Sequence, residues 1–132
     1  MEKFNQDKLA KIVKRFNLKL ILLFGSQVDG KTHQESDVDL AYLSNQDLTP
    51  KQEIDLNYDF TSLCQTSRVD TIDLRIAPPL FLKQILDNHQ IVYQESPLVF
   101  SVFEAMVLQK YQEARPLFQM RHRRLKEFVA SL

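Results

Sequence analysis

Apolar side chains recur along this chain in short blocks whose spacing predicts alternating helices and strands. Four apolar residues between Leu9 and Phe16 follow the i, i+3, i+4, i+7 spacing of an amphipathic helix, which we expect over residues 5–16. The run 18–24 is almost continuously apolar and ends at Gly25. It is too short for an ordinary helix, so it predicts a buried strand.

The middle of the chain repeats this alternation. Thr49, Pro50 and Gln52 are typical of a helix start, because threonine caps, proline fits the first turn and glutamine completes a capping box. An apolar stripe follows up to Cys64, and a second short helix ends near Asp87. Three further strands are predicted, at 37–43, 69–76 and 90–94.

The last third of the chain predicts two helices. The first begins at Ser96-Pro97, and we expect Pro116 to break or kink it, because proline removes a backbone hydrogen bond at a cost of about 3 kcal/mol. The second covers 117–132 and carries a cluster of basic residues. This basic run is either a solvated helix face or a docking surface for an acidic partner.

The elements add up to an α/β fold: a mixed sheet of about four strands, packed helices and a helical C-terminal tail. We expect one domain over residues 1–132, with a core at about 5–95 and C-terminal helices at about 97–131. The 17 basic and 17 acidic residues balance, which argues against a nucleic-acid-binding or membrane-binding surface. No signal pattern or apolar span is evident, so a cytoplasmic location is expected.

The candidate chemistry lies around the first glycine. Gly25 and Ser26 follow the buried strand, and glycine lets the backbone approach a ligand closely while serine adds donors for phosphate oxygens. Asp37 and Asp39 come ten residues later, two apart on a predicted strand, so both carboxylates share one face. Two carboxylates on one face repel each other unless cations lie between them, and their oxygen ligands select Mg²⁺ or Mn²⁺. In many enzymes, two such ions about 3.5–4 Å apart hold a phosphoryl centre.

A two-ion site needs a third carboxylate, and the strand 69–76 offers Asp70 and Asp73 on opposite faces. Alternation predicts that Asp73 faces solvent. Asp70 shares its face with apolar residues, and a buried carboxylate is normally paired or metal-bound. Asp70 is therefore the better candidate, and the choice between the two stays open.

The order Gly25-Ser26, ten residues, Asp37-Val38-Asp39 and a later Val69-Asp70 strand resembles the minimal nucleotidyltransferases of the polymerase-β superfamily. The segment 73–94 is also similar to that of MntA antitoxins, which are paired with HepT toxins. This resemblance implies that Gly25 and Ser26 hold the triphosphate of ATP. It implies that Asp37, Asp39 and Asp70 ligate two Mg²⁺ ions and that Asp70 helps to deprotonate the acceptor hydroxyl.

The MntA resemblance also implies a specific activity: transfer of AMP from ATP to a tyrosine of a HepT-type RNase toxin, which neutralises the toxin. Two alternatives remain at this stage. One is a nucleotidyltransferase that modifies a small molecule, as the aminoglycoside-modifying enzymes do. The other is an antitoxin that blocks its toxin by binding alone. The acceptor itself does not follow from the composition or the spacing of this chain.

Overall fold

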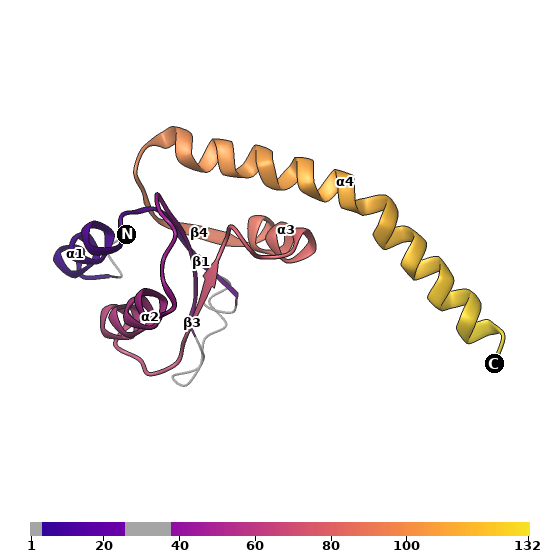
Figure 1. Ribbon diagram of the computed structural model, residues 1–132, viewed down its shortest axis with the longest axis horizontal. Helices are drawn as coiled ribbons and strands as arrows, with labels where there is room; N and C mark the ends of the chain where they lie inside the picture. Colours follow the sequence, from indigo (N-terminus) through magenta and orange to yellow (C-terminus); the bar gives the residue numbers. More distant parts are fainter. Residues whose placement is uncertain (1–3, 26–37) are drawn as a thin grey trace.

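The computed structural model describes residues 4–25 and 38–132 of the 132-residue chain (Figure 1). The four predicted strands and the three predicted helices that precede residue 90 are present, and the C-terminal region differs from the prediction. The described elements, in chain order, are α1 (Gln6–Phe16), β1 (Leu18–Phe24), β2 (Val38–Ser44), α2 (Pro50–Cys64), β3 (Val69–Asp73), α3 (Pro79–Asp87), β4 (His89–Gln94) and α4 (Pro97–Ala130).

Local hydrogen bonds explain why the first two helices begin and end where they do. The side chain of Asn5 accepts bonds from the first backbone N–H groups of α1, and Asn17 ends the helix in a left-handed conformation. Thr49 and Gln52 form the predicted capping box at the start of α2, with Pro50 in the first turn. The residue types that form these caps can be recognised in the sequence, which is why the starts of both helices were predictable.

The four strands form one mixed sheet in the order β3-β2-β1-β4. The central strand β1 pairs antiparallel with both β2 and β4, whereas β2 and β3 are parallel. The predicted α/β class and the mixed sheet of about four strands are therefore confirmed. Within the described residues, β3 and β4 are the two edge strands.

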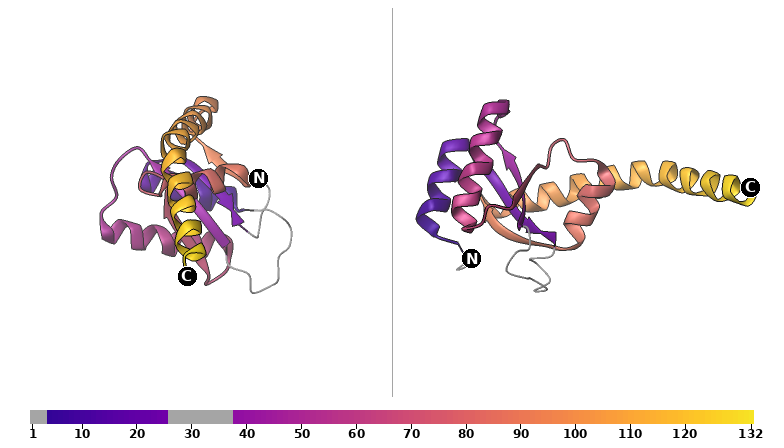
Figure 2. Two further views of the ribbon diagram at one scale, coloured as in Figure 1. Left: turned by 90° about the vertical axis from the view of Figure 1, so that its right-hand side faces the viewer. Right: turned by 90° about the horizontal axis from the view of Figure 1, so that it is seen from below.

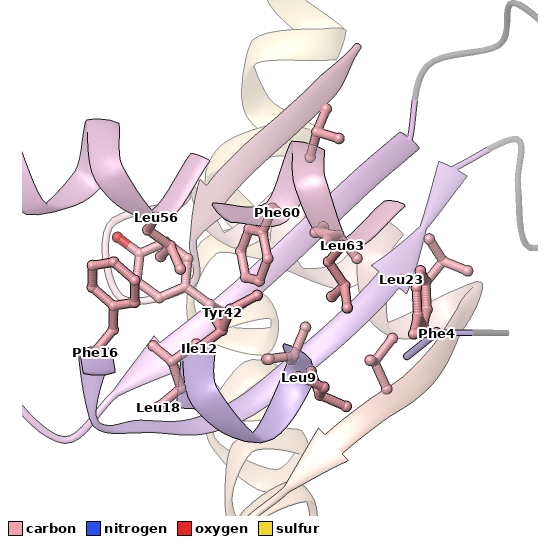
Figure 3. Close-up of a cluster of buried hydrophobic side chains, with 14 of the residues drawn as sticks. Phe4, Leu9, Ile12, Phe16, Leu18, Leu23, Tyr42, Leu56, Phe60 and Leu63 are labelled. Carbon is pink, nitrogen blue, oxygen red and sulfur yellow. The ribbon is translucent and has the colours of Figure 1, made fainter. Parts of the chain in front are cut away.

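Helices cover both faces of this sheet. On one face α1 and α2 pack against the strands through a cluster that includes Phe16, Leu56 and Phe60 (Figure 3). On the other face α3 and the first half of α4 contribute Leu82, Phe103 and others to a second cluster. Side chains of β1 and β2 alternate between the two clusters, as expected for strands that are buried on both sides.

The C-terminal region differs from the prediction. The expectation of a separate second helix after Pro116 is wrong, because α4 (Pro97–Ala130) is one helix of 34 residues that continues through this proline; of the two outcomes expected there, a break or a kink, the break does not occur. Figures 1 and 2 show that α4 crosses the sheet beside α3, bends part-way along and then projects away from the other elements. Pro116 is exposed, so water can satisfy the backbone carbonyl that loses its partner, and a bend suffices.

The third strand is also shorter than predicted. It ends at Asp73 instead of Ile76, and the chain turns there before α3. No helix within the described parts of the chain is long and apolar enough to cross a membrane.

Candidate active site

Two acidic residues from neighbouring strands lie side by side at one end of the sheet. Asp39 of β2 and Asp70 of β3 are register partners in the parallel pair, and Asp39 is also the partner of Phe24, the last residue of β1. Register partners on adjacent strands are about 4.8 Å apart and point to the same face. The two carboxylates therefore share a face, although they lie 31 positions apart in the sequence.

That face is the one covered by α3 and α4. Ala41 lies two residues beyond Asp39 and belongs to the cluster under these helices, and Ile72 lies two residues beyond Asp70 and packs against the same cluster. By strand alternation the two carboxylates point the same way, beyond the end of the packed core. Asp39 is half-buried and Asp70, on the edge strand, is exposed.

Gly25 lies directly against the Asp39 carboxylate. Its φ of +79° is in the region that side chains disfavour. A Cβ placed on this residue would lie 2.2 Å from Asp39 Oδ2, closer than real Cβ atoms approach other atoms. Both the backbone conformation and the space thus require glycine here, and the absent side chain leaves room for the carboxylate.

The remaining predicted site residues, Ser26 and Asp37, lie outside the described residues. Within the described parts of the chain there is no group of three or more acidic, histidine or cysteine side chains arranged to hold a metal ion. The three-carboxylate site predicted from the sequence therefore needs Asp37 in addition to Asp39 and Asp70.

Asp73, the other candidate for the third carboxylate, has a different environment from the one predicted. The expectation that it faces solvent is wrong: its side chain is buried, and Arg75 donates to it from Nη2 at 3.2 Å and from its backbone N–H at 2.9 Å. Arg75 also pairs with Asp47. The argument that Asp70 is the buried carboxylate is wrong as well, since Asp70 is exposed.

The surroundings of Asp73 have an electrostatic effect on its register partner, Tyr42. Burial raises the pKa of Tyr42 to about 12, and the charges of Asp73 and Glu53 act in the same direction. The hydrogen bonds that Arg75 donates to Asp73 and Asp47 raise the pKa of its guanidinium. Tyr42 and Asp73 lie on the α2 side of the sheet, opposite the face that carries Asp39 and Asp70.

Comparison with known proteins shows the family. The family described as "Polymerase beta, Nucleotidyltransferase" matches residues 7–98, which is more than half of the chain. The chain belongs to the polymerase-β nucleotidyltransferase family. Its α/β fold is accordingly the nucleotidyltransferase fold predicted from the sequence.

Relatives within this family are similar over most of the chain. The protein adenylyltransferase MntA of Shewanella oneidensis is 29% identical over 119 residues, covering 87% of this chain and 85% of that protein. A crystal structure of a toxin–antitoxin with AMP-PNP superposes with a TM-score of 0.79 at 25% identity and covers 92% of this chain and 98% of that chain. A structure of a tri-AMPylated S. oneidensis HEPN toxin in complex with MNT antitoxin superposes with a TM-score of 0.72 at 22% identity. The match covers 92% of this chain and 95% of that chain. At this identity it supports the fold alone.

In this nucleotidyltransferase, aromatic side chains lie in the same row as the carboxylates. The sequence analysis did not predict this arrangement. Phe24 is the register partner of both Asp39 and His89, so Asp70, Asp39, Phe24 and His89 form one row across all four strands. The ring of Phe24 meets Phe81 of α3 edge-on at 5.8 Å. Only the register of the strands reveals this row, and a single sequence does not give the register.

The ring of His89 is fixed in this row. Its Nδ1 lies 2.8 Å from the carbonyl oxygen of Leu86 and the ring stacks on Phe100 at 4.8 Å between centroids. A carbonyl only accepts, so Nδ1 carries the hydrogen and Nε2 of the neutral ring is left as an acceptor. Phe24 separates this histidine from the carboxylates.

A cavity of about 690 Å³ opens at the β3 edge of the sheet, between α2 and the start of α3. Tyr42, Asn57, Asp73 and Phe81 are among the residues that line it, whereas Asp39 and Asp70 do not. The carboxylate pair therefore lies outside this cavity, on the end of the sheet next to Gly25.

Proposed function

We propose that this nucleotidyltransferase is an antitoxin that transfers AMP from ATP to a tyrosine hydroxyl of a cognate HepT-type RNase toxin and so neutralises it. The observation that carries the chemistry is the pairing of Asp39 with Asp70 beside Gly25. The similarity to MntA, a protein adenylyltransferase, supports a protein as the acceptor. The proposal places the chain in the cytoplasm, where ATP and the RNA substrates of such a toxin are found.

The residues present fit divalent metal ions. Carboxylate oxygens are the ligands that Mg²⁺ prefers, and the space that a Cβ at position 25 would fill is taken by the Asp39 carboxylate. We assign Asp37, Asp39 and Asp70 as the residues that hold two Mg²⁺ ions. When bound, Mg²⁺ supplies positive charge that neutralises the triphosphate and the departing pyrophosphate.

The chain's own groups position the reactants. Gly25 and Ser26 offer backbone N–H groups and a hydroxyl to the triphosphate of ATP, at a turn where the backbone can approach closely. The exposed Asp70 faces the acceptor hydroxyl and takes part in removing its proton. The tyrosine oxygen then bonds to the α-phosphorus of ATP as the bond from this phosphorus to the bridging oxygen of the β-phosphate breaks, and the β- and γ-phosphates leave as pyrophosphate.

The experiment is intact-mass analysis of the cognate HepT-type toxin after incubation with this protein, ATP and Mg²⁺. The expected product is toxin heavier by one AMP group or a small number of them, modified on tyrosine. The double variant Asp37→Ala, Asp39→Ala should leave the toxin unmodified. Continued modification of the toxin by this variant would refute the assigned site. Transfer of AMP to a small hydroxyl compound instead of the toxin would identify a different acceptor.

A matched pair of variants separates the two candidates for the third carboxylate. Asp70→Asn should abolish the transfer while leaving the free energy of unfolding nearly unchanged, because Asp70 is exposed. Asp73→Asn should destabilise the protein, because it weakens the buried ion pair with Arg75, yet the folded fraction should still transfer AMP. The reverse pattern would assign the role to Asp73. Neutralisation of the toxin by the inactive variants would indicate inhibition by binding alone.

A further inference from the structure

One row of backbone groups on the edge strand β3 points away from the sheet. The carbonyl oxygen of Arg68 accepts a hydrogen bond from β2, and the N–H of Leu74 donates one to β2. Because backbone groups alternate in direction along a strand, every second residue between these two also points toward β2. The N–H and C=O groups of Val69, Thr71 and Asp73 therefore point outward.

Two of these outward groups are used within the chain. The side-chain amide of Asn57, from α2, donates to the C=O of Val69 at 2.9 Å, and the C=O of Asp73 accepts from Ile76 in the following turn. Among the residues that the structure describes, no group bonds to the backbone N–H or C=O of Thr71. Thr71 thus presents a donor and an acceptor together, which is what one residue of an added strand matches.

The cavity of about 690 Å³ at the β3 edge lies directly beside these groups. Thr71 lines it, together with Ile54 of α2 and Ile76 of the turn, whose side chains are 70% and 77% exposed. Exposed apolar side chains around a cavity mark a surface that another molecule covers. A segment that pairs with Thr71 can place apolar side chains in this cavity, and such pockets give specificity to strand addition.

The residue before Thr71 on β3 is Asp70, the carboxylate that we assign to the acceptor hydroxyl. In an added strand, paired residues point their side chains to the same face of the sheet. A residue paired with Asp70 therefore lies on the face of the carboxylates. Its neighbour, paired with Thr71, points to the α2 side, where the Thr71 hydroxyl accepts from Asn57 and both residues line the cavity.

The size and charge of this edge favour a short segment that is neutral or basic. Stable interfaces bury about 1,600 Å² and contain about ten hydrogen bonds, whereas the described part of β3 offers only a few backbone groups. The exposed carboxylates of Glu53 and Asp70 lie near Thr71 and would repel an acidic segment or the same carboxylates of a second copy. A weak contact of this kind suits a substrate segment that must leave after the transfer.

We propose that β3 binds the acceptor segment of the toxin as an added strand, with the acceptor tyrosine opposite Asp70 and an apolar neighbour opposite Thr71. This inference rests on the proposed function, since it takes a protein tyrosine as the acceptor. It adds the form and chemistry of that acceptor: an extended segment, apolar next to the tyrosine and not acidic.

A matched pair of substitutions at Thr71 tests this proposal through the kinetics of AMP transfer to the toxin. Thr71→Pro removes the outward N–H and places a ring at the edge, and an edge strand tolerates proline because no bond to β2 is lost. Thr71→Val is the control, because both variants lose the hydroxyl that accepts from Asn57 but valine keeps the N–H. The kcat/KM for the toxin should be about tenfold lower with proline than with valine, as expected for one lost hydrogen bond, while KM for ATP agrees within about twofold.

A second pair of variants tests the cavity. Ile54→Lys places a charge in its lining, and the control Tyr58→Lys places the same charge one turn further along α2, on an equally exposed side chain outside the lining. The first should raise KM for the toxin by about fivefold, which is the loss expected for one contributing contact, and the second should leave it unchanged.

Amide hydrogen exchange tests the proposal without any variant, and so decides it if Thr71→Pro does not fold. In the unaltered full-length chain, the N–H groups of Thr71 and Asp73 should exchange about tenfold more slowly when the toxin is present without ATP. Slowing that depends on the concentration of the chain alone, and needs no toxin, would make a second copy the occupant and overturn the proposal.

The outcomes for this proposal and for the proposed function are distinguishable. Transfer of AMP to the toxin with equal kcat/KM in the proline and valine variants, or exchange at Thr71 that the toxin does not slow, would overturn strand addition and leave the proposed function intact. If the unaltered chain does not modify the toxin at all, the proposed function fails. Protection of Thr71 by the toxin then decides alone whether β3 binds a segment of this partner.

Discussion

Substitution of Gly25 by alanine is the most direct test of the geometry beside Asp39. The added methyl group would lie 2.2 Å from Asp39 Oδ2, and contacts of real Cβ atoms essentially never fall below 3.0 Å. The carboxylate must therefore move by about 0.8 Å. Displacements of about 1 Å in a catalytic group reduce rates by as much as ~100-fold, so we expect AMP transfer to fall by about that factor.

The same substitution should also reduce stability. A side chain at φ +79° costs about 1–2 kcal/mol in backbone strain, to which the displacement of the carboxylate adds. For a chain of this size each kcal/mol corresponds to a lowering of Tm by about 3–5 °C. Urea unfolding and the rate of AMP transfer, measured on the same preparation, give both quantities.

A double-mutant cycle with Asp39→Ala separates the clash from the strain. Without the carboxylate, the atom nearest to the new methyl group is the Cβ of residue 39, at an ordinary contact distance of 3.5 Å. Gly25→Ala should then cost only the strain, so the two substitutions should be non-additive. Equal costs in both backgrounds, together with a transfer rate within twofold of the unaltered protein, would refute the placement of Asp39 against Gly25.

Two further predictions concern Tyr42 and Pro116. The pKa of Tyr42 is raised from 10.0 to about 12 by burial and then by Asp73 and Glu53, so its stabilising effect is complete below pH 10 and is lost as the pH rises toward 12. The free energy of unfolding, measured by urea unfolding, should fall by up to about 1.4 kcal/mol per pH unit between pH 10 and 12. In the variant Tyr42→Phe it should fall less steeply with pH, and an equal pH dependence in the two proteins would contradict the prediction. Pro116→Ala restores a backbone N–H donor inside α4 and should stabilise this helix by up to about 3 kcal/mol. Circular dichroism should show greater helical ellipticity, while the midpoint of thermal unfolding of the core stays unchanged. Unchanged ellipticity would contradict the prediction.

The elements of the fold were predictable because local signals define them. The apolar run from Leu18 to Phe24 and the capping box of Thr49 and Gln52 are each contained within a few consecutive residues. The continuous α4 was not predictable from the same rules. Proline is disfavoured inside a helix because it removes a backbone hydrogen bond and its ring clashes with the preceding turn. Pro116 is exposed, so a bend relieves the clash and water can bind the carbonyl group that loses its partner.

The candidate site was predictable only in part. The residue types and spacing around Gly25 pointed to phosphate and metal chemistry, but the pairing of Asp39 with Asp70 depends on the register between β2 and β3. Strand alternation misjudged Asp73, because β3 ends there and the turn directs Arg75 back onto its carboxylate. Contacts between distant segments, such as Phe24 with His89, have no local signature at all.

The position of Asp70 at the edge of the sheet suits a macromolecular acceptor in the proposed reaction. Asp39 lies on an inner strand, between β1 and β3, with its carboxylate against Gly25. Among the strands that the structure describes, β3 has a neighbour on one side only, and Asp70 on it is exposed. A tyrosine presented by another protein can therefore reach this carboxylate from the open edge, while a nucleotide contacts the Gly25 side of the pair.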